Sequence, residues 1–252
     1  MGRKRFIVFD GLDGIGKGVA IKALIDHLKV QGLRIFDLHD FWSKHNEHPE
    51  FDDKSSELFV SLDDFDVLVS SEPTYVGIGL VVRNELTANN SRPYYARTIA
   101  NGYSNDRLVL YRRVVLPVLK AGKIVVQSRS VSTSLVYQPL QKLLPGEKPL
   151  SRKEVMSLEG NAFTLRNAPD LLILATISDA FEVMKRLKNR VKDDDCKFEN
   201  LDFQMKINPM FESKELKEIF ESRGTIVKYL DASISIESTK KQAVEIYEEF
   251  IR

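Results

Sequence analysis

A glycine-rich segment near the start of the chain constrains its fold more than any other feature. The segment reads Gly11-x-x-x-x-Gly16-Lys17 and follows a short apolar run at positions 6–9, the pattern of a buried strand. Behind it, apolar residues keep the spacing of one helix face: Ile21, Leu24, Ile25 and Leu28. Strand, loop and helix in this order form a phosphate-binding loop, whose backbone N–H groups hold phosphate oxygens. We therefore expect a nucleotide phosphate site in which Lys17 reaches the β- and γ-phosphates.

The residue after Lys17 departs from the usual pattern of such loops. The pattern asks for Ser or Thr, whose hydroxyl ligates magnesium, and this chain has Gly18. The loop is expected to bind phosphate without that hydroxyl ligand.

Composition sets the class of protein. With 252 residues, of which 43% are apolar, the chain can bury a sizeable core and is most simply one α/β domain. A net charge of +1 gives no electrostatic reason to expect a nucleic acid or membrane partner. The single cysteine, Cys196, excludes an internal disulfide, and no signal-like or long apolar run is visible. These features predict a cytoplasmic protein.

Short apolar runs alternate with helical patterns along the rest of the chain. The expected strands after the first are 33–38, 66–70, 124–126, 171–175 and 225–229. The expected helices after the first are 81–86, 95–119, 132–138, 198–220 and 236–251. This alternation predicts a central parallel sheet with helices on both faces.

The acidic segment 39–66 interrupts this alternation. It holds Trp42 and three of the four histidines, His39, His45 and His48. The histidine spacing matches no standard set of metal ligands, so a solvated insertion is favoured over a metal site.

Polar residues that follow the strands are candidate site residues, because ligands of parallel sheets bind beyond the carboxyl ends of strands. Glu72 follows one expected strand and Arg129 another. A basic run at 184–192 follows the strand 171–175, and it is either a solvated helix face or a lid over nucleotide phosphates.

Six short blocks, taken in order, resemble the thymidylate kinase family of nucleoside monophosphate kinases. They cover residues 9–18, 71–74, 105–107, 120–129, 132–138 and 168–171. The resemblance implies a Rossmann-like P-loop fold over residues 1–252, with 39–66 as an insertion and a lid at about 184–200. It also implies transfer of the γ-phosphoryl group of ATP to dTMP with Mg²⁺, giving dTDP and ADP, by a homodimer.

The resemblance assigns roles to individual residues. On the ATP side it implies Gly11, Leu12, Asp13, Gly14, Ile15, Gly16, Lys17 and Gly18, with Arg186, Arg190 and Lys192 in the lid. On the acceptor side it implies Glu72, Arg83, Arg107, Arg129, Tyr137 and Gln138. Lys17, Arg129 and Glu72 are the expected catalytic residues. For Arg83 and Lys192 a surface charge is an equally good interpretation.

Three positions depart from the family pattern. Gly18 lacks the hydroxyl, Ser128 stands where an aspartate usually precedes Arg129, and Ser71 stands where an arginine often precedes Glu72. We hypothesise that magnesium is held through nucleotide oxygens and water, with Asp10, Asp13 or Glu72 in the outer shell. A non-catalytic nucleotide-binding relative and a deoxynucleoside kinase are the alternatives.

Overall fold

The structure is a computed structural model that describes residues 5–179, 181–183, 196–198 and 200–252. The expected lid residues Arg186, Arg190 and Lys192 lie outside the described residues.

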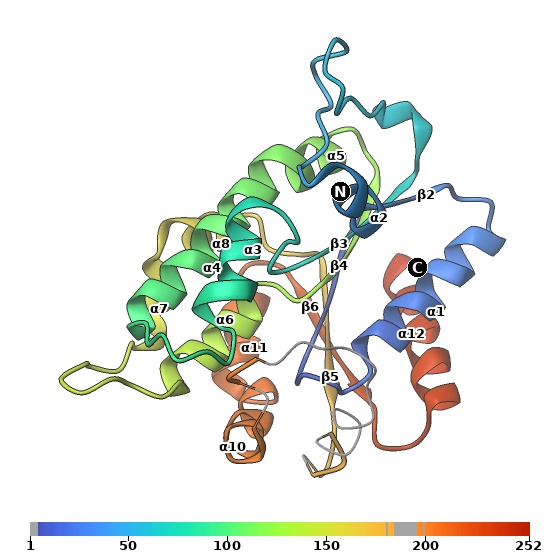
Figure 1. The fold of residues 1–252 in the computed structure, drawn as a ribbon. Helices are drawn as coiled ribbons and strands as arrows, with labels where there is room; N and C mark the ends of the chain where they lie inside the picture. The colour runs from blue at the N-terminus through green and yellow to red at the C-terminus, as the bar shows by residue number, and fades with distance from the viewer. Residues whose placement is uncertain (1–4, 180, 184–195, 199) are drawn as a thin grey trace.

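A six-stranded sheet organises the fold (Figure 1). Its strands follow the order β2-β3-β4-β1-β5-β6, and all neighbouring pairs are parallel. The strands are β1 (Phe6–Asp10), β2 (Ile35–Asp37), β3 (Val67–Ser71), β4 (Ile124–Ser128), β5 (Leu171–Thr176) and β6 (Ile226–Asp231). The predicted α/β fold with a parallel sheet is confirmed.

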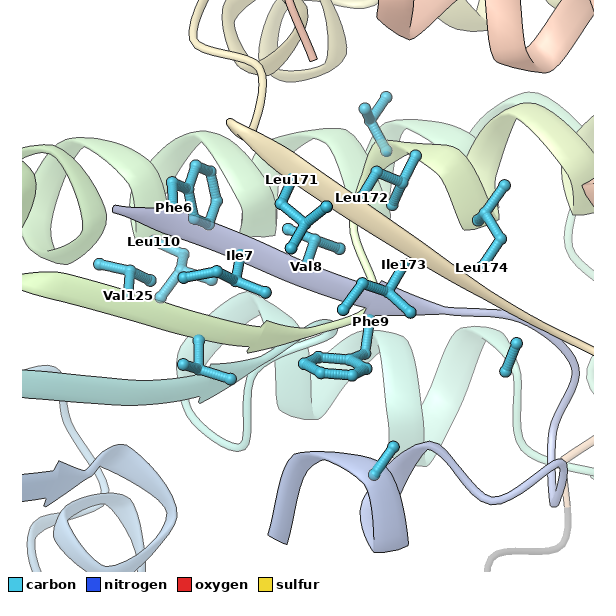
Figure 2. Packing of buried hydrophobic residues seen from close by; sticks show 14 of the residues in the cluster. Phe6, Ile7, Val8, Phe9, Leu110, Val125, Leu171, Leu172, Ile173 and Leu174 are labelled. Carbon is cyan, nitrogen blue, oxygen red and sulfur yellow. The ribbon is translucent and has the colours of Figure 1, made fainter. Parts of the chain in front are cut away.

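Strand β1 lies inside the sheet and is buried on both faces. Every residue from Phe6 to Asp10 is buried, which explains why the run is continuously apolar up to the aspartate. Figure 2 shows these side chains beside Val125 of β4 and the leucines and isoleucine of β5. The glycine-rich loop therefore begins at the end of a strand that is held firmly inside the sheet.

Helices cover both faces of the sheet (Figure 1). On one face, α1 (Lys17–Val30) packs against α12 (Ile236–Ile251). On the other face, α4 (Ala96–Leu110) packs against α8 (Glu159–Arg166). Further helices among the described residues are α2 (Leu38–His45), α3 (Gly77–Val81), α5 (Leu116–Lys120), α6 (Val131–Tyr137), α7 (Arg152–Ser157), α10 (Leu201–Phe211) and α11 (Lys214–Glu221). Within the described part of the chain, no helix combines the length and apolar character that crossing a bilayer requires.

Single helical turns extend several of these helices. Two π-helical turns, η2 (Val82–Leu86) and η3 (Tyr111–Val115), continue α3 and α4, so the predicted helices 81–86 and 95–119 are both present. The 3-10 turns are η1 (Leu62–Asp64) and η4 (Gln138–Leu140).

A glycine allows the close approach of α4 and α8. A Cβ added to Gly160 would lie 1.8 Å from the backbone oxygen of Ser104. Because backbone cannot move aside cheaply, any larger residue at this position would force the two helices apart.

Two predictions about helices need correction. The stretch 198–220 is two helices, because α10 ends at Phe211 and Ser213 caps α11 through a hydrogen bond from the backbone N–H of Leu216. Helices α7 and α8 were not predicted at all, although Ser151 and Glu154 form a capping box at the start of α7.

The prediction that 39–66 is a solvated insertion is wrong for much of the segment. Its first residues form α2, which Asp37 caps by accepting a hydrogen bond from the backbone N–H of His39 at 2.9 Å. Trp42 is buried, and its indole Nε1 donates to Nδ1 of buried His48 at 3.3 Å. Phe41, Phe51 and Phe65 are also buried. The charged residues between these apolar anchors are the solvated part.

Candidate active site

The glycine-rich loop wraps around the ammonium group of Lys17. Three glycines take left-handed backbone angles, with φ of 137° at Gly11, 75° at Gly14 and 114° at Gly16. Gly11 has a second reason to be glycine, because an added Cβ would lie 2.7 Å from the backbone oxygen of Ala175. Lys17 is almost fully buried, and its Nζ donates to the carbonyl oxygens of Gly11, at 2.9 Å, and Leu12. The loop therefore holds the positive charge of Lys17 in a fixed position.

Leu12 and Ile15 contribute to this loop through their backbone only. Both side chains are fully buried in the apolar core. Any contact they make with a nucleotide must come from the main chain.

Asp10, at the end of β1, ties the loop to the start of α6. Its Oδ1 accepts from the backbone N–H of Gly11 at 2.8 Å and from the Thr133 hydroxyl at 2.7 Å. Its Oδ2 accepts from the Ser132 hydroxyl and from the backbone N–H of Thr133 at 2.9 Å. These hydrogen bonds satisfy both oxygens of a side chain that is fully buried.

Arg129, after β4, reaches the loop from the other side. Its φ of 66° is left-handed, unusual for a residue other than glycine, and its Nη2 forms an ion pair with Asp13. The Tyr137 hydroxyl of α6 donates to the second oxygen of Asp13 at 2.9 Å. The predicted residues Asp13, Arg129 and Tyr137 therefore form one hydrogen-bonded group.

Glu72 and Arg107 form a buried ion pair beyond the ends of β3 and β4. Arg107 Nε donates to Glu72 Oε2 at 2.6 Å, and Gln127 Nε2 donates to Oε1 at 3.0 Å. The other guanidinium nitrogens of Arg107 donate to the Asn161 side chain and to Ser134 Oγ at 3.2 Å. Burial raises the pKa of Glu72 to about 7, although the charge of Arg107 acts in the opposite direction.

The turn after Glu72 is held by Asp106 and Arg83. Asp106 accepts from the backbone N–H of Thr74 at 2.8 Å and from its hydroxyl at 2.6 Å. Arg83 Nε donates to the carbonyl oxygens of Pro73 and Thr74, both at 3.1 Å, and its guanidinium stacks 3.8 Å from the centre of the Tyr75 ring. Arg83 is thus a fixed wall of the site and not a free surface charge.

A second hydrogen-bonded chain runs from β2 to β3. Asp37 Oδ1 lies 2.7 Å from His39 Nδ1, and His39 Nε2 lies 2.8 Å from Ser71 Oγ. Ser71 and Ser128, two of the three positions that depart from the family pattern, are register partners in the sheet. No local pattern indicates this chain, because Asp37 and Ser71 are 34 residues apart and His39 lies in an acidic segment.

One cleft of about 970 Å³ brings most of these groups together. The predicted residues on its walls are Asp13, Gly14, Lys17, Gly18, Glu72, Arg83, Arg107, Arg129, Tyr137 and Gln138. Asp10, Gly11, Leu12, Ile15 and Gly16 are not among the residues that line it. Gln138 is buried, and its Oε1 has no hydrogen-bond partner among the described residues, so it can accept from a ligand.

The acidic groups of this cleft offer little direct coordination to a metal ion. Among the described residues there is no cluster of three or more His, Cys, Asp or Glu side chains that could hold one. Both oxygens of Glu72 accept hydrogen bonds, and Gly18 contributes no hydroxyl. The site fits an ion that arrives on a nucleotide better than one held by protein ligands alone.

Comparison with known proteins identifies the family. A sequence model described as thymidylate kinase matches residues 56–243, about three quarters of the chain. The chain belongs to the thymidylate kinase family. It is 25% identical over 245 residues to thymidylate kinase of Caldanaerobacter subterraneus subsp. tengcongensis, with 97% of both chains covered. It is 26% identical over 228 residues to thymidylate kinase of Caldicellulosiruptor saccharolyticus, covering 88% of this chain and 90% of that one.

The fold of this thymidylate kinase family member also has a solved counterpart. A structure described as thymidylate kinase from Candida albicans superposes with a TM-score of 0.62 at 16% identity, covering 99% of this chain and 94% of the other. The family match begins at residue 56, after the glycine-rich loop, whereas the Caldanaerobacter relative aligns over nearly the whole chain.

Proposed function

We propose that the protein transfers the γ-phosphoryl group of ATP to the 5′-phosphate of dTMP, giving ADP and dTDP. The observation that carries this proposal is a single cleft with the phosphate loop at one side and the Glu72, Arg83 and Arg107 group at the other. Family membership supports it independently.

The chemistry needs charge and positioning more than covalent help. Transfer between two phosphates develops negative charge on the moving group and requires donor and acceptor in line. Lys17 would exchange its bonds to the loop carbonyls for bonds to ATP phosphates. Arg129 stands beside the loop on the cleft wall, where its guanidinium would bridge donor and acceptor phosphates.

Arg107 and Glu72 would shape the acceptor side. The acceptor is already anionic, so Glu72 is not needed as a base. Its role in this proposal is to orient Arg107, and Gln138 would accept a hydrogen bond from the base of the acceptor.

Magnesium would accompany ATP. When bound, it would screen phosphate charge and orient the β- and γ-groups. Asp10 and Glu72 stay candidate outer-shell residues acting through water, and the chain's own task would be to fix the phosphates around the ion. The proposal also includes a single kinase domain, a homodimer and a cytoplasmic location, without a nucleic acid or membrane partner.

A coupled ADP-release assay tests the proposed reaction. Purified protein receives magnesium and ATP with dTMP, with each other nucleoside monophosphate, with thymidine, or with no acceptor. We expect turnover with dTMP. Turnover with thymidine alone would indicate a nucleoside kinase, and ATP binding without turnover on any acceptor would indicate a non-catalytic relative.

A pair of lysine variants ties that activity to the loop. Lys17→Ala should lower kcat/KM for ATP by about 100-fold or more, because it removes a charged donor from the transferring phosphates. Lys241→Ala is the matched control, since Lys241 lies on α12 outside the cleft, is exposed and forms a surface ion pair with Glu245. Equal activity of the two variants would contradict the assignment of Lys17.

A further inference from the structure

The chain Asp37–His39–Ser71 fixes the orientation of one imidazole ring at the cleft. Asp37 Oδ1 accepts hydrogen bonds from the backbone N–H of His39 at 2.9 Å and from the ring nitrogen Nδ1, 2.7 Å away. Partial burial raises the pKa of Asp37, but its hydrogen bonds from His39 outweigh this and leave the pKa below its ordinary value. An ionised carboxylate can only accept, so Nδ1 carries a proton in both charge states of the ring.

The other ring nitrogen then has two states with opposite effects on Ser71. In the neutral ring, Nε2 is an acceptor, and the Ser71 hydroxyl donates its hydrogen to it across 2.8 Å. In the protonated ring, Nε2–H donates to Ser71 Oγ, and the serine hydrogen is released to point elsewhere. The charge of His39 therefore decides whether Ser71 is a donor toward the cleft.

The position of Ser71 shows what that donor would meet. Ser71 is the last residue of β3, is only 7% exposed and lines the cleft together with Asp37 and His39. It precedes Glu72, whose partner Arg107 lies on the same cleft wall. A buried hydroxyl at a strand end that lines a ligand cleft, in hydrogen-bond contact with a histidine, is suited to an anionic oxygen.

We propose that Ser71 donates a hydrogen bond to the phosphate of the acceptor nucleotide and that His39, oriented by Asp37, is the positioning residue that turns this donor on. The inference rests on the proposed kinase function and adds a specificity-determining pair to it.

Other charged groups near this pair bear on its pH dependence. His39 packs edge-on against Trp42 and Tyr75, with ring centres 5.4 and 5.6 Å apart. The titratable or charged groups that line the same cleft around it are Lys29 and Asp26 on α1, Asp37 on β2, and Glu72, Tyr75 and Arg83 beyond β3. Of these, Glu72 titrates near pH 7, so a pH profile must be read against a variant in which only His39 is changed.

Ser71→Ala is the first test. It should raise KM for dTMP about tenfold, the effect of one hydrogen bond to a charged group, with KM for ATP unchanged. Inhibition by thymidine, which lacks the phosphate, should be unaffected. Ser43→Ala is the control, because Ser43 is an exposed serine of α2 outside the cleft. An unchanged KM for dTMP, or an equal weakening of inhibition by thymidine, would overturn the proposal.

His39→Gln is the second test, read as a pH profile of KM for dTMP. In the wild type, KM should be lower with the protonated ring than with the neutral ring, because only the neutral ring accepts the Ser71 hydrogen. The dTMP phosphate and Glu72 titrate in both proteins, so the ratio of the two profiles isolates His39. His45→Gln, on the same helix but stacked on Phe41 outside the cleft, should keep the wild-type profile.

The outcomes separate this inference from the proposed function. A constant ratio of the His39→Gln and wild-type profiles would assign the Asp37–His39–Ser71 chain to structure alone and overturn the inference while the kinase activity stands. No turnover by the wild type would instead contradict the kinase proposal. Far-ultraviolet circular dichroism and the melting temperature of each variant exclude misfolding as the cause of a raised KM.

Discussion

Glu72 and Arg107 are joined by a 2.6 Å hydrogen bond, and both side chains are at most 3% exposed. Two opposite charges withdrawn from water lose hydration energy that their mutual attraction repays only when the surrounding hydrogen bonds are complete. Here Gln127, Asn161 and Ser134 complete them. The pair therefore links β3, β4, α4, α6 and α8 at the floor of the cleft, and removing either partner should affect stability as well as activity.

Arg107→Met should destabilise the fold by about 3–5 kcal/mol at pH 8, where Glu72 is ionised in the wild type, because it leaves Glu72, Asn161 and Ser134 buried without their donor. Urea unfolding followed by circular dichroism measures the change. Arg112→Met is the control: Arg112 follows on the same helical run, is exposed, and only stacks on Phe163, so its loss should cost less than about 1 kcal/mol. Similar losses for both variants would show that the buried pair contributes little.

Glu72→Gln should change how stability depends on pH. The pKa of Glu72 is about 7 when folded and 4.5 in the unfolded reference, so between these values the folded chain holds a proton that the unfolded chain has released. The stability contributed by this group is complete below pH 4.5 and is lost as pH rises toward 7, by on the order of 3 kcal/mol. The stability of Glu72→Gln relative to wild type should therefore improve from pH 4.5 to 7.5. A constant difference in urea unfolding would contradict the raised pKa.

His48→Asn should change the pH dependence of stability in the direction opposite to that of Glu72→Gln. Burial lowers the pKa of His48 to about 4, and the charge of Arg113 acts in the same direction. The neutral ring accepts the Trp42 indole hydrogen at Nδ1. The unfolded histidine, with a pKa of 6.5, binds a proton first as pH falls. The stability from this group is present above pH 6.5 and is lost by about 3 kcal/mol as pH falls to 4.

Unfolding by urea at pH 7 and pH 4.5 measures this effect, with the single tryptophan, Trp42, as a fluorescent reporter beside the substitution. The loss on acidification should be smaller in His48→Asn than in the wild type. His45→Asn, whose ring is exposed and stacks on Phe41, should lose as much as the wild type. Equal acid sensitivity of all three proteins would rule out His48 as the source.

The sequence predicted what depends on local pattern and missed what depends on distant partners. The run 6–9 was recognisable as a strand because burial on both faces demands continuous apolar residues, and α12 was predicted with its observed bounds. The Ser151–Glu154 capping box is a local sequence signal from which the start of α7 can be predicted. General rules of parallel sheets also indicated that Glu72 and Arg129 follow strand ends, and both line the cleft that Lys17 lines.

The rest of the site required three-dimensional contacts. Charged side chains are usually exposed, so nothing in the sequence indicated that Arg107 is buried and donates hydrogen bonds to Glu72 and Asn161. His39 looked like one more polar residue in an acidic segment, because its partner Ser71 is 32 residues away. The burial of Trp42 and His48 could not be predicted either. An acidic composition describes the average of a segment and does not show which of its side chains are buried.

Gly18→Ser should restore the hydroxyl that phosphate loops usually place after the lysine. Gly18 is exposed in the first turn of α1, its backbone has no positive φ, and an added Cβ would meet nothing within 4 Å, so the side chain fits. Since the described residues include no cluster of side chains that could hold a metal ion, an added hydroxyl should lower the Mg²⁺ concentration needed for half-maximal ADP release by up to about tenfold. Gly18→Ala is the matched control, because both variants gain helix propensity and only serine adds a ligand. If Ser and Ala variants show the same Mg²⁺ dependence, magnesium binding does not depend on the hydroxyl that Gly18 lacks, and the nucleotide alone holds the ion.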